Sequence, residues 1–289
     1  MIIGHNDIID KLNKLINNNE VAHSYIFNGK EGIGKLLVAL DFARNILCGD
    51  NQKERLSFDN HNHPDFNLIK PDEKGAIKIE TIREMIKDIS IKPILAKYKV
   101  YIIDNADSIT PQAQNALLKT LEEPPNYAVI ILVTSKYNSL LNTIRSRSQK
   151  LDFTKLKNSD IINYMKDNNY QTNLDQKLIL SLIDGSIGNI SQVFDNIDAI
   201  NKLVSFIDNI QNVNAIELND MAIYLGEQKD NIYMLLDYLE TIMYERIKNA
   251  DISRYIKSIE EAKKNIQGNV NFEICIDKML LAFEEEQYV

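Results

Sequence analysis

The sequence predicts an α/β domain with a parallel sheet, followed by a small helical domain and a C-terminal all-helical domain. Three observations support this fold class. Strand-like and helix-like segments alternate up to about residue 153, all six prolines lie within the first 125 residues, and most of the net charge falls after residue 200. Alternating strands and helices favour a parallel sheet with helices on both faces, and a long proline-free stretch favours uninterrupted helices.

The elements of the first domain follow from local patterns. Apolar residues at helical spacing predict a helix over residues 8–16, and the short apolar run 25–27 predicts a strand that leads into a glycine-rich turn. A second helix should follow over residues 35–47. The same patterns predict strands over 65–69, 99–104 and 127–133, and helices over 79–89 and 111–122. We therefore expect the α/β domain to cover residues 1–153.

The rest of the chain is expected to be helical. Residues 154–197 show only short helical patterns, interrupted by the run from Asp184 to Asn189, and predict a small helical domain. Residues 198–289 contain longer amphipathic patterns and predict a helical bundle. The long helical segments are expected at 232–247 and 252–266, with breaks at Gly226 and Gly268.

Composition excludes several classes of protein. With 289 residues, 44% hydrophobic and 26% charged, the chain is typical of a soluble globular protein of two or three domains. Its longest apolar run, residues 127–133, is far shorter than the roughly 20 residues of a membrane span, and its N-terminus has no secretory pattern. Cys48 and Cys275 are too few and too distant for a disulfide framework. These features predict a bacterial-type cytoplasmic protein without membrane contact.

The acidic residues are concentrated at the C-terminal end. Residues 201–289 contain 16 Asp and Glu against 9 Lys and Arg, a net of −7 within the whole chain's −8. Binding DNA by phosphate neutralisation requires clustered Lys and Arg, so an autonomous nucleic-acid-binding module is disfavoured. The acidic end is expected either to repel DNA or to face another protein.

The glycine-rich turn, Gly29-Lys30-Glu31-Gly32-Ile33-Gly34-Lys35-Leu36, fits the phosphate-loop pattern G-x-x-x-x-G-K-[ST] everywhere except at its last position. The pattern predicts phosphate binding by Gly29, Gly32, Gly34 and Lys35, through backbone N–H groups and the lysine ammonium. Leu36 replaces the hydroxyl that coordinates magnesium, which compromises metal-dependent hydrolysis. The alternative is a turn that only joins a strand to a helix, and whether the loop still binds a nucleotide stays open.

Asp104 follows an apolar strand and is expected at the sheet edge where ligands bind. In a nucleotide-hydrolysing site this aspartate would bind magnesium, and a carboxylate next to it would activate water. Here the next residue is Asn105, whose amide is a poor general base. Asp107 is expected to be a helix cap or a surface charge. Leu36 and Asn105 together indicate a nucleotide fold that has lost hydrolysis.

Two longer strings carry a family resemblance. Residues 112–125 read Gln-Ala-Gln-Asn-Ala-Leu-Leu-Lys-Thr-Leu-Glu-Glu-Pro-Pro, and residues 142–149 read Asn-Thr-Ile-Arg-Ser-Arg-Ser-Gln. Together with His23 to Gly29 and His63-Pro64-Asp65-Phe66, they closely resemble clamp-loader subunits of bacterial DNA polymerase III, in the AAA+ superfamily. The resemblance is strong over the first 153 residues and only architectural after Asn189. It implies an AAA+ α/β domain, a small helical lid and a helical collar that assembles with other loader subunits.

The same resemblance assigns a role to Arg147. Its setting, Ser146-Arg147-Ser148, is similar to the family's arginine-finger motif, with serine in place of a cysteine. This implies that Arg147 reaches in trans the ATP of a neighbouring motor subunit, where a guanidinium stabilises the charge of the transferring phosphoryl group. The alternative is an arginine paired with a nearby carboxylate. Arg145 and Lys150 are expected to supply local positive charge.

The sequence also departs from the family's pattern. Of the four zinc-ligand cysteines that commonly follow the phosphate-loop helix, only Cys48 is present, followed by His61 and His63. Because a structural zinc site needs four ligands, zinc is disfavoured, and no metal or required cofactor is expected. Asn189 stands where motor subunits carry a sensor arginine. Thr134 is either the first sensor or an ordinary strand-end residue.

The resemblance thus implies a non-motor (stator) clamp-loader subunit without intrinsic ATPase activity, which helps load the sliding clamp onto primed DNA. The implied partners are gamma/tau-like motor subunits and a delta-like wrench subunit. The clamp and the DNA would be contacted through the complex. An ATP-hydrolysing motor subunit is the alternative, and it is disfavoured by Leu36, Asn105 and Asn189.

Overall fold

The computed structural model describes residues 2–247 and 252–284. The described chain divides into two compact units. The first unit contains the residues up to Asn163 together with Gly185–Gly188, and the second contains Tyr164–Asp184 and the residues from Asn189 onward. The division of the sequence at residues 153 and 197 stays a prediction.

Within the described residues, five strands form one parallel sheet in the first unit. Its spatial order is β2-β3-β4-β1-β5. The strands are β1 (Ser24–Asn28), β2 (Phe66–Ile69), β3 (Lys99–Ile103), β4 (Ala128–Thr134) and β5 (Gln149–Asp152). This order places β3, β4 and β1 side by side, so the residues that follow these strands meet at one edge of the sheet.

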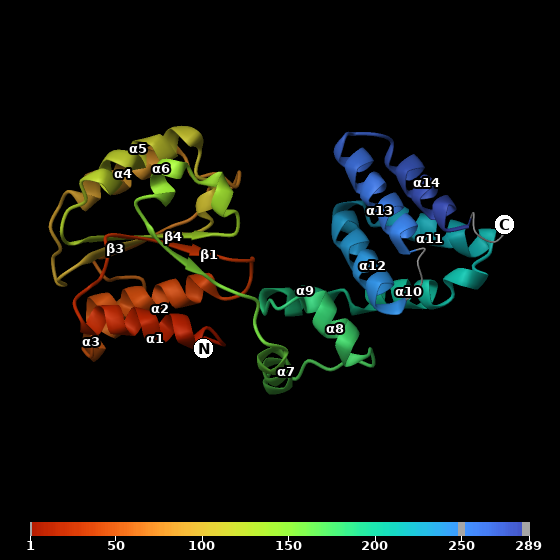
Figure 1. Cartoon of the computed structure of the whole chain (residues 1–289), viewed down its shortest axis with the longest axis horizontal. Helices are drawn as coiled ribbons and strands as arrows, with labels where there is room; N and C mark the ends of the chain where they lie inside the picture. The colour runs from red at the N-terminus through yellow and green to blue at the C-terminus, as the bar shows by residue number, and fades with distance from the viewer. Residues whose placement is uncertain (1, 248–251, 285–289) are drawn as a thin grey trace. The chain divides into compact units, whose positions relative to one another are not determined.

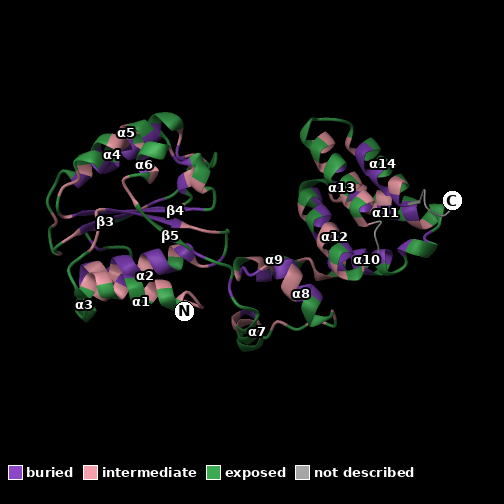
Figure 2. Ribbon diagram, viewed as in Figure 1, coloured by how far each residue is buried: buried purple, intermediate pink, exposed green. Residues whose placement is uncertain are grey.

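Helices cover both faces of this sheet (Figure 1). On one face lie α1 (Asn6–Asn17), α2 (Lys35–Cys48) and α3 (Gln52–Asp59), and on the other lie α4 (Ile79–Ile89), α5 (Pro111–Glu122) and α6 (Asn142–Arg145). Successive strand residues face opposite sides, so Val100 and Ile102 pack with α2 while Tyr101 and Ile103 pack with α5. The central strands β3, β4 and β1 are therefore buried on both faces, as Figure 2 shows for β3 and β4.

Local sequence explains the bounds of α5, the helix that precedes the double proline. Thr110 caps its N-terminus by accepting a hydrogen bond from the Ala113 N–H at 3.4 Å, and Pro111 occupies its first turn. Ala113, Leu117 and Leu121 recur at helical spacing and are buried. The helix ends at Glu122 because Pro124 and Pro125 cannot continue it.

The described residues of the second unit form helices joined by loops and contain no strand. Helix α7 (Asn158–Asp167), which begins in the first unit, is followed by α8 (Gln176–Ile183), α9 (Gly188–Asp195), α10 (Ile197–Asp208), α11 (Ala215–Glu227), α12 (Ile232–Arg246), α13 (Ile252–Gln267) and α14 (Phe272–Glu284). Helix α12 packs against α8, α10 and α13, and α14 packs against α11 and α13. None of the helices in the described ranges is long and apolar enough to cross a membrane.

The structure confirms the parallel sheet and the expected strands and helices of the first unit. The patterns gave no sign of α3, α6 or β5. Gly268 directly follows α13, as expected of a helix break. The break expected at Gly226 is also present, because α11 ends at Glu227, one residue after this glycine, and α12 begins at Ile232.

Candidate functional site

The glycine-rich turn follows β1 at the carboxyl edge of the sheet. Gly32 and Gly34 have φ angles of 73° and 98°, in the left-handed region that favours glycine. A Cβ at Gly32 would lie 2.3 Å from Ser186 Oγ, so only glycine fits there. Gly29 donates its N–H to the Thr134 carbonyl at 3.2 Å, which joins the loop to the end of β4.

Residues 185–188 lie directly against this loop. The Gly188 N–H donates to the Gly32 carbonyl at 3.0 Å, and Ser186 Oγ donates to the Glu31 carbonyl at 3.0 Å. A Cβ on Gly188 would come within 2.8 Å of Gly32 Cα. The two backbones therefore touch, and both positions require glycine.

Lys35 begins α2 and is held inside the loop. Its Nζ donates to the Gly29 carbonyl at 2.6 Å and to the Lys30 carbonyl, and the side chain is 7% exposed. Burial lowers the pKa of Lys35, while nearby carboxylates act in the opposite direction. A phosphate at this loop would have to replace the two carbonyl contacts of the ammonium. Chemically, the loop keeps a cation and a helix N-terminus, which are the parts that attract phosphate.

Asp104 and Asp107, which follow β3, and Thr134, the last residue of β4, lie at the same sheet edge. Asp107 Oδ1 accepts hydrogen bonds from Thr134 Oγ1 at 2.8 Å and from the Ser135 N–H at 3.1 Å. Of the two roles expected of Asp107, the helix cap is wrong, because Thr110 caps the next helix instead. The Asp107 side chain is half-exposed and joins the turn after β3 to the end of β4. Burial raises the pKa of Asp104, although its bond from the Asn105 N–H opposes this.

The structure gives local reasons for the two departures from a hydrolytic site. Leu36 is half-buried and packs against the core between the sheet and α2, so an apolar side chain suits its position. Asn105 has a φ of 49°, a left-handed conformation that asparagine tolerates better than most residues. Neither side chain supplies a carboxylate or hydroxyl oxygen to the site.

Arg147 lies in the turn between α6 and β5, away from the phosphate loop along β1. Its Nη2 forms an ion pair with Glu122 Oε1 at 2.9 Å, and its Nη1 donates to the Thr143 carbonyl at 3.0 Å. The pairing with a carboxylate, expected as the alternative to a finger, is thus present in the chain. The arginine side chain keeps 34% of its surface exposed.

A surface cavity of about 690 Å³ opens beside Arg147. Its lining is Ala22, His23, Ser24, Leu121, Glu122, Ser146, Arg147, Ser148 and Gln149. Ser148 Oγ donates to the Ile144 carbonyl at 3.0 Å and lies 2.7 Å from Ser24 Oγ. The hydroxyl that replaces the family's thiol therefore joins the finger turn to the start of β1. Sequence reasoning missed Ser24, because 124 residues separate it from Ser148.

Arg145 and Lys150 both lie over the ring of Tyr137. The Arg145 guanidinium carbon is 4.9 Å from the ring centroid, and Lys150 Nζ is 4.3 Å from it. Lys150 also pairs with Asp152 at 2.8 Å. These contacts hold the two cations close to the chain, which fits the local role expected of them.

Cys48, Glu54 and His63 form the one group of three metal-type donors found in the residues that the structure describes. His63 Nδ1 accepts the Asp65 N–H at 3.2 Å, so the neutral ring carries its proton on Nε2. Neither nitrogen then has a free lone pair for a metal. His61 is exposed and lies outside this group. The residues therefore do not fit the family's tetrahedral zinc site.

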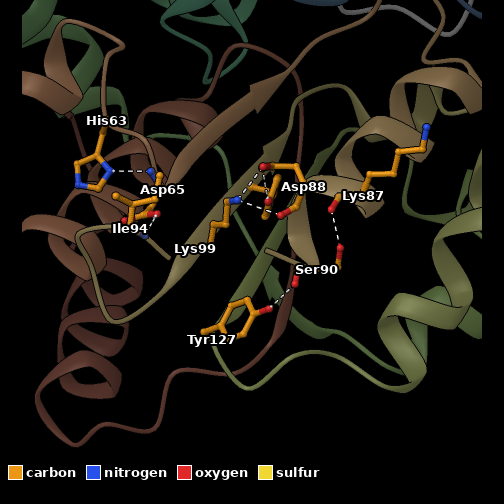
Figure 3. Close-up of polar contacts among 9 residues, drawn as sticks. His63, Asp65, Lys87, Asp88, Ser90, Ile94, Lys99 and Tyr127 are labelled. Carbon is orange, nitrogen blue, oxygen red and sulfur yellow. Dashed lines mark hydrogen bonds and ion pairs between the residues drawn. The ribbon is translucent and has the colours of Figure 1, made fainter. Parts of the chain in front are cut away.

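The neighbouring Asp65 anchors the loop between α4 and β3 (Figure 3). Its carboxylate accepts the N–H groups of Ile94, Leu95 and Ala96 at 2.7, 2.8 and 2.9 Å. Burial raises the pKa of Asp65, but the three backbone donors outweigh it and lower the pKa below its ordinary value. At the start of β3, Lys99 Nζ pairs with Asp88 of α4 at 2.7 Å.

Asn189 lies in the second unit, in the first turn of α9. Its Nδ2 donates to the Ile183 carbonyl at 3.1 Å, so the side chain joins α9 to the end of α8. This contact gives Asn189 a structural role within its own unit.

The sheet order, the phosphate-type loop and the strand-end residues define a P-loop protein of the AAA+ class. The chain belongs to the family described as DNA polymerase III, delta subunit, whose model matches residues 4–157, more than half of its length.

Two relatives extend this result. The DNA polymerase III subunit delta' of Bacillus subtilis is 25% identical, over 97% of this chain and 97% of that protein. The tau/gamma subunit of Haemophilus influenzae is 31% identical over 57% of this chain, and the chain covers 25% of that longer protein. The match along the whole length confirms the resemblance to delta-prime subunits.

One solved structure shares the fold. It is a DNA polymerase III gamma subunit-related protein of Thermotoga maritima, with a TM-score of 0.56 and 18% identity. The match covers 96% of this chain and 99% of that protein. The AAA+ fold class expected from the sequence is confirmed.

Proposed function

We propose that the chain is a non-motor (stator) subunit of a DNA polymerase III clamp loader that supplies Arg147 in trans to ATP bound by a neighbouring motor subunit. The observation that carries the proposal is a partly exposed guanidinium beside a surface cavity, in a chain whose own phosphate loop lacks hydrolytic side chains. Its partners would be gamma/tau-like and delta-like subunits. The sliding clamp and primed DNA would be reached through the complex, in the cytoplasm.

The arginine role is physically reasonable. A permanently charged, planar guanidinium stabilises the negative charge that develops on a transferring phosphoryl group. Its remaining N–H groups are available, because the contacts to Glu122 and Thr143 use only part of the donor fork. The proposal requires no cofactor bound to this chain.

The test is Arg147→Ala in the reconstituted complex. Hydrolysis at the single ATP site that this chain completes should slow on the order of a hundredfold, because one transition-state donor is lost. A single-turnover experiment with bound ATP measures the amplitude of the fast phase of product formation. This amplitude should fall by the contribution of one ATP site. Arg145→Ala is the matched control, and its fast-phase amplitude should equal that of the unchanged chain. An unchanged amplitude in the Arg147→Ala complex would sink the in-trans role.

The rival function is that of an ATP-hydrolysing motor subunit. Retention of Gly29, Gly32, Gly34, Lys35 and Asp104 around the loop favours it, whereas Leu36 and Asn105 oppose it. The purified chain alone should hydrolyse ATP no faster than its Lys35→Ala variant, because magnesium and the attacking water would lack their usual side chains. Magnesium-dependent turnover that the Lys35→Ala change abolishes would favour the motor function instead.

A further inference from the structure

The contact between Glu122 and Arg147 joins the ends of two different elements. Glu122 is the last residue of α5, and Arg147 follows α6. Helices α5 and α6 pack against each other, and Leu117, Leu121 and Ile144 are buried in the same hydrophobic core. The ion pair of 2.9 Å therefore connects the exposed turn that carries Arg147 to a helix anchored in the core.

The guanidinium is held through two of its nitrogens, which make contacts with different partners. Nη2 pairs with the Glu122 carboxylate, while Nη1 donates to the Thr143 carbonyl at 3.0 Å and to Ser146 Oγ at 3.4 Å. Contacts at two different nitrogens fix the plane of the guanidinium as well as its position. A free arginine side chain loses rotamer entropy when it binds a phosphate, and contacts that already hold the side chain reduce that loss. The chain thus restricts the arginine before any partner arrives.

Resting on the proposed in-trans function of Arg147, we propose that Glu122 is a positioning residue that holds the Arg147 guanidinium in the orientation from which it meets the neighbouring subunit's ATP phosphates. Glu122 itself does not contact the nucleotide. Its side chain is 48% exposed, so the pair lies in a region where solvent and salt screen the attraction. The effect on rate is accordingly modest, in the range of exposed ion pairs.

The adjacent Glu123 provides a matched control. It is also exposed and carries the same charge, but it makes no ion pair with any residue in the described ranges 2–247 and 252–284. Replacing it changes the net charge of the turn by the same amount as replacing Glu122. A difference between the two variants therefore reports the contact with Arg147 and not the local charge.

The test uses the reconstituted complex with all its subunits and measures single-turnover ATP hydrolysis at the site completed by this chain. Glu122→Ala should slow hydrolysis by about two- to fivefold, with unchanged ATP affinity and unchanged assembly. Glu122→Gln, which keeps an acceptor oxygen but no charge, should recover part of the rate. Glu123→Ala should behave as the unchanged chain. Raising the salt concentration to about 0.5 M should reduce the difference in hydrolysis rate between the unchanged chain and Glu122→Ala, because salt screens the exposed ion pair.

A double-mutant cycle with Arg147→Ala separates this inference from the proposed function. In the Arg147→Ala chain, replacing Glu122 should have no further effect. If Arg147→Ala slows hydrolysis but Glu122→Ala leaves the rate of hydrolysis unchanged or raises it, only the positioning role is overturned. An equal loss from Glu122→Ala with and without Arg147 indicates a purely structural role and also overturns it. If Arg147→Ala leaves the rate of hydrolysis unchanged, both the in-trans function and the positioning role are overturned.

Discussion

At the scale of single residues, Asp65 shows how one buried carboxylate organises a loop. The side chain is 0% exposed and accepts three backbone N–H groups from residues 94–96. Such charge-assisted bonds are stronger than neutral ones, and they compensate for the cost of burying the charge. Ile94 and Leu95 are 71% and 60% exposed, so few apolar contacts could hold this loop without the carboxylate.

We expect Asp65→Asn to destabilise the chain by roughly 2–4 kcal/mol at pH 7, because the amide turns a donor toward backbone N–H groups. The pKa of Asp65 is lowered in the folded chain, so the stabilisation is present above the unfolded pKa of about 3.9 and disappears as the pH falls through the folded pKa. The difference in free energy of unfolding between the unchanged chain and Asp65→Asn should therefore decrease below about pH 4. Urea unfolding between pH 3 and pH 7 measures this.

Asp72→Asn is the control for that experiment. Asp72 also accepts two backbone N–H groups and has a lowered pKa, owing first to its bond with Lys78, but it is exposed. Its replacement should have a smaller effect at pH 7 than replacement of Asp65. Equal effects of the two changes, or a gap for Asp65→Asn that is constant with pH, would contradict the role assigned to the buried carboxylate.

At the scale of elements, the strands and helices that could be predicted from the sequence are those with the most buried residues. The apolar strands β3 and β4 are buried at every position, and their runs of branched residues were evident in the sequence. The edge strand β5 pairs with β1 alone among the described strands and buries only Leu151. Its other residues are polar, so the sequence shows no apolar run from which a strand could be predicted. Helix α3 is likewise polar and buries only Phe58.

The same distinction holds for the candidate site. The glycines of the phosphate loop and Lys35 are contiguous, so their sequence pattern sufficed to place them on one turn. The contacts between Asp107 and Thr134, and between Ser24 and Ser148, span 27 and 124 residues. Only the order of the strands in the sheet brings these pairs together, and no local periodicity encodes that order.

At the scale of the whole molecule, the charge distribution bears on how the chain meets DNA. The end that carries nearly all the net charge of −8 consists of helices and short connections in its described residues, while the first unit carries Lys and Arg in nearly equal number to Asp and Glu. Several cations of the first unit are engaged, because Arg147 pairs with Glu122 and Lys99 with Asp88. The 33 Lys and Arg of the chain are outnumbered by its 41 Asp and Glu, so the isolated chain has no excess of cations with which to neutralise phosphates.

We therefore expect the purified chain to bind primed DNA no more tightly than the roughly 10⁻⁴ to 10⁻⁶ M typical of nonspecific binding at physiological salt. Fluorescence anisotropy with a labelled primer–template, at about 50 to 200 mM salt, measures the affinity and its salt dependence. The reconstituted complex is the matched comparison and should bind more tightly, because its other subunits add contacts. Tight binding by the isolated chain that falls steeply with salt would show a basic surface strong enough to act alone. It would assign DNA contact to this subunit itself and weaken the view that it works through its protein neighbours.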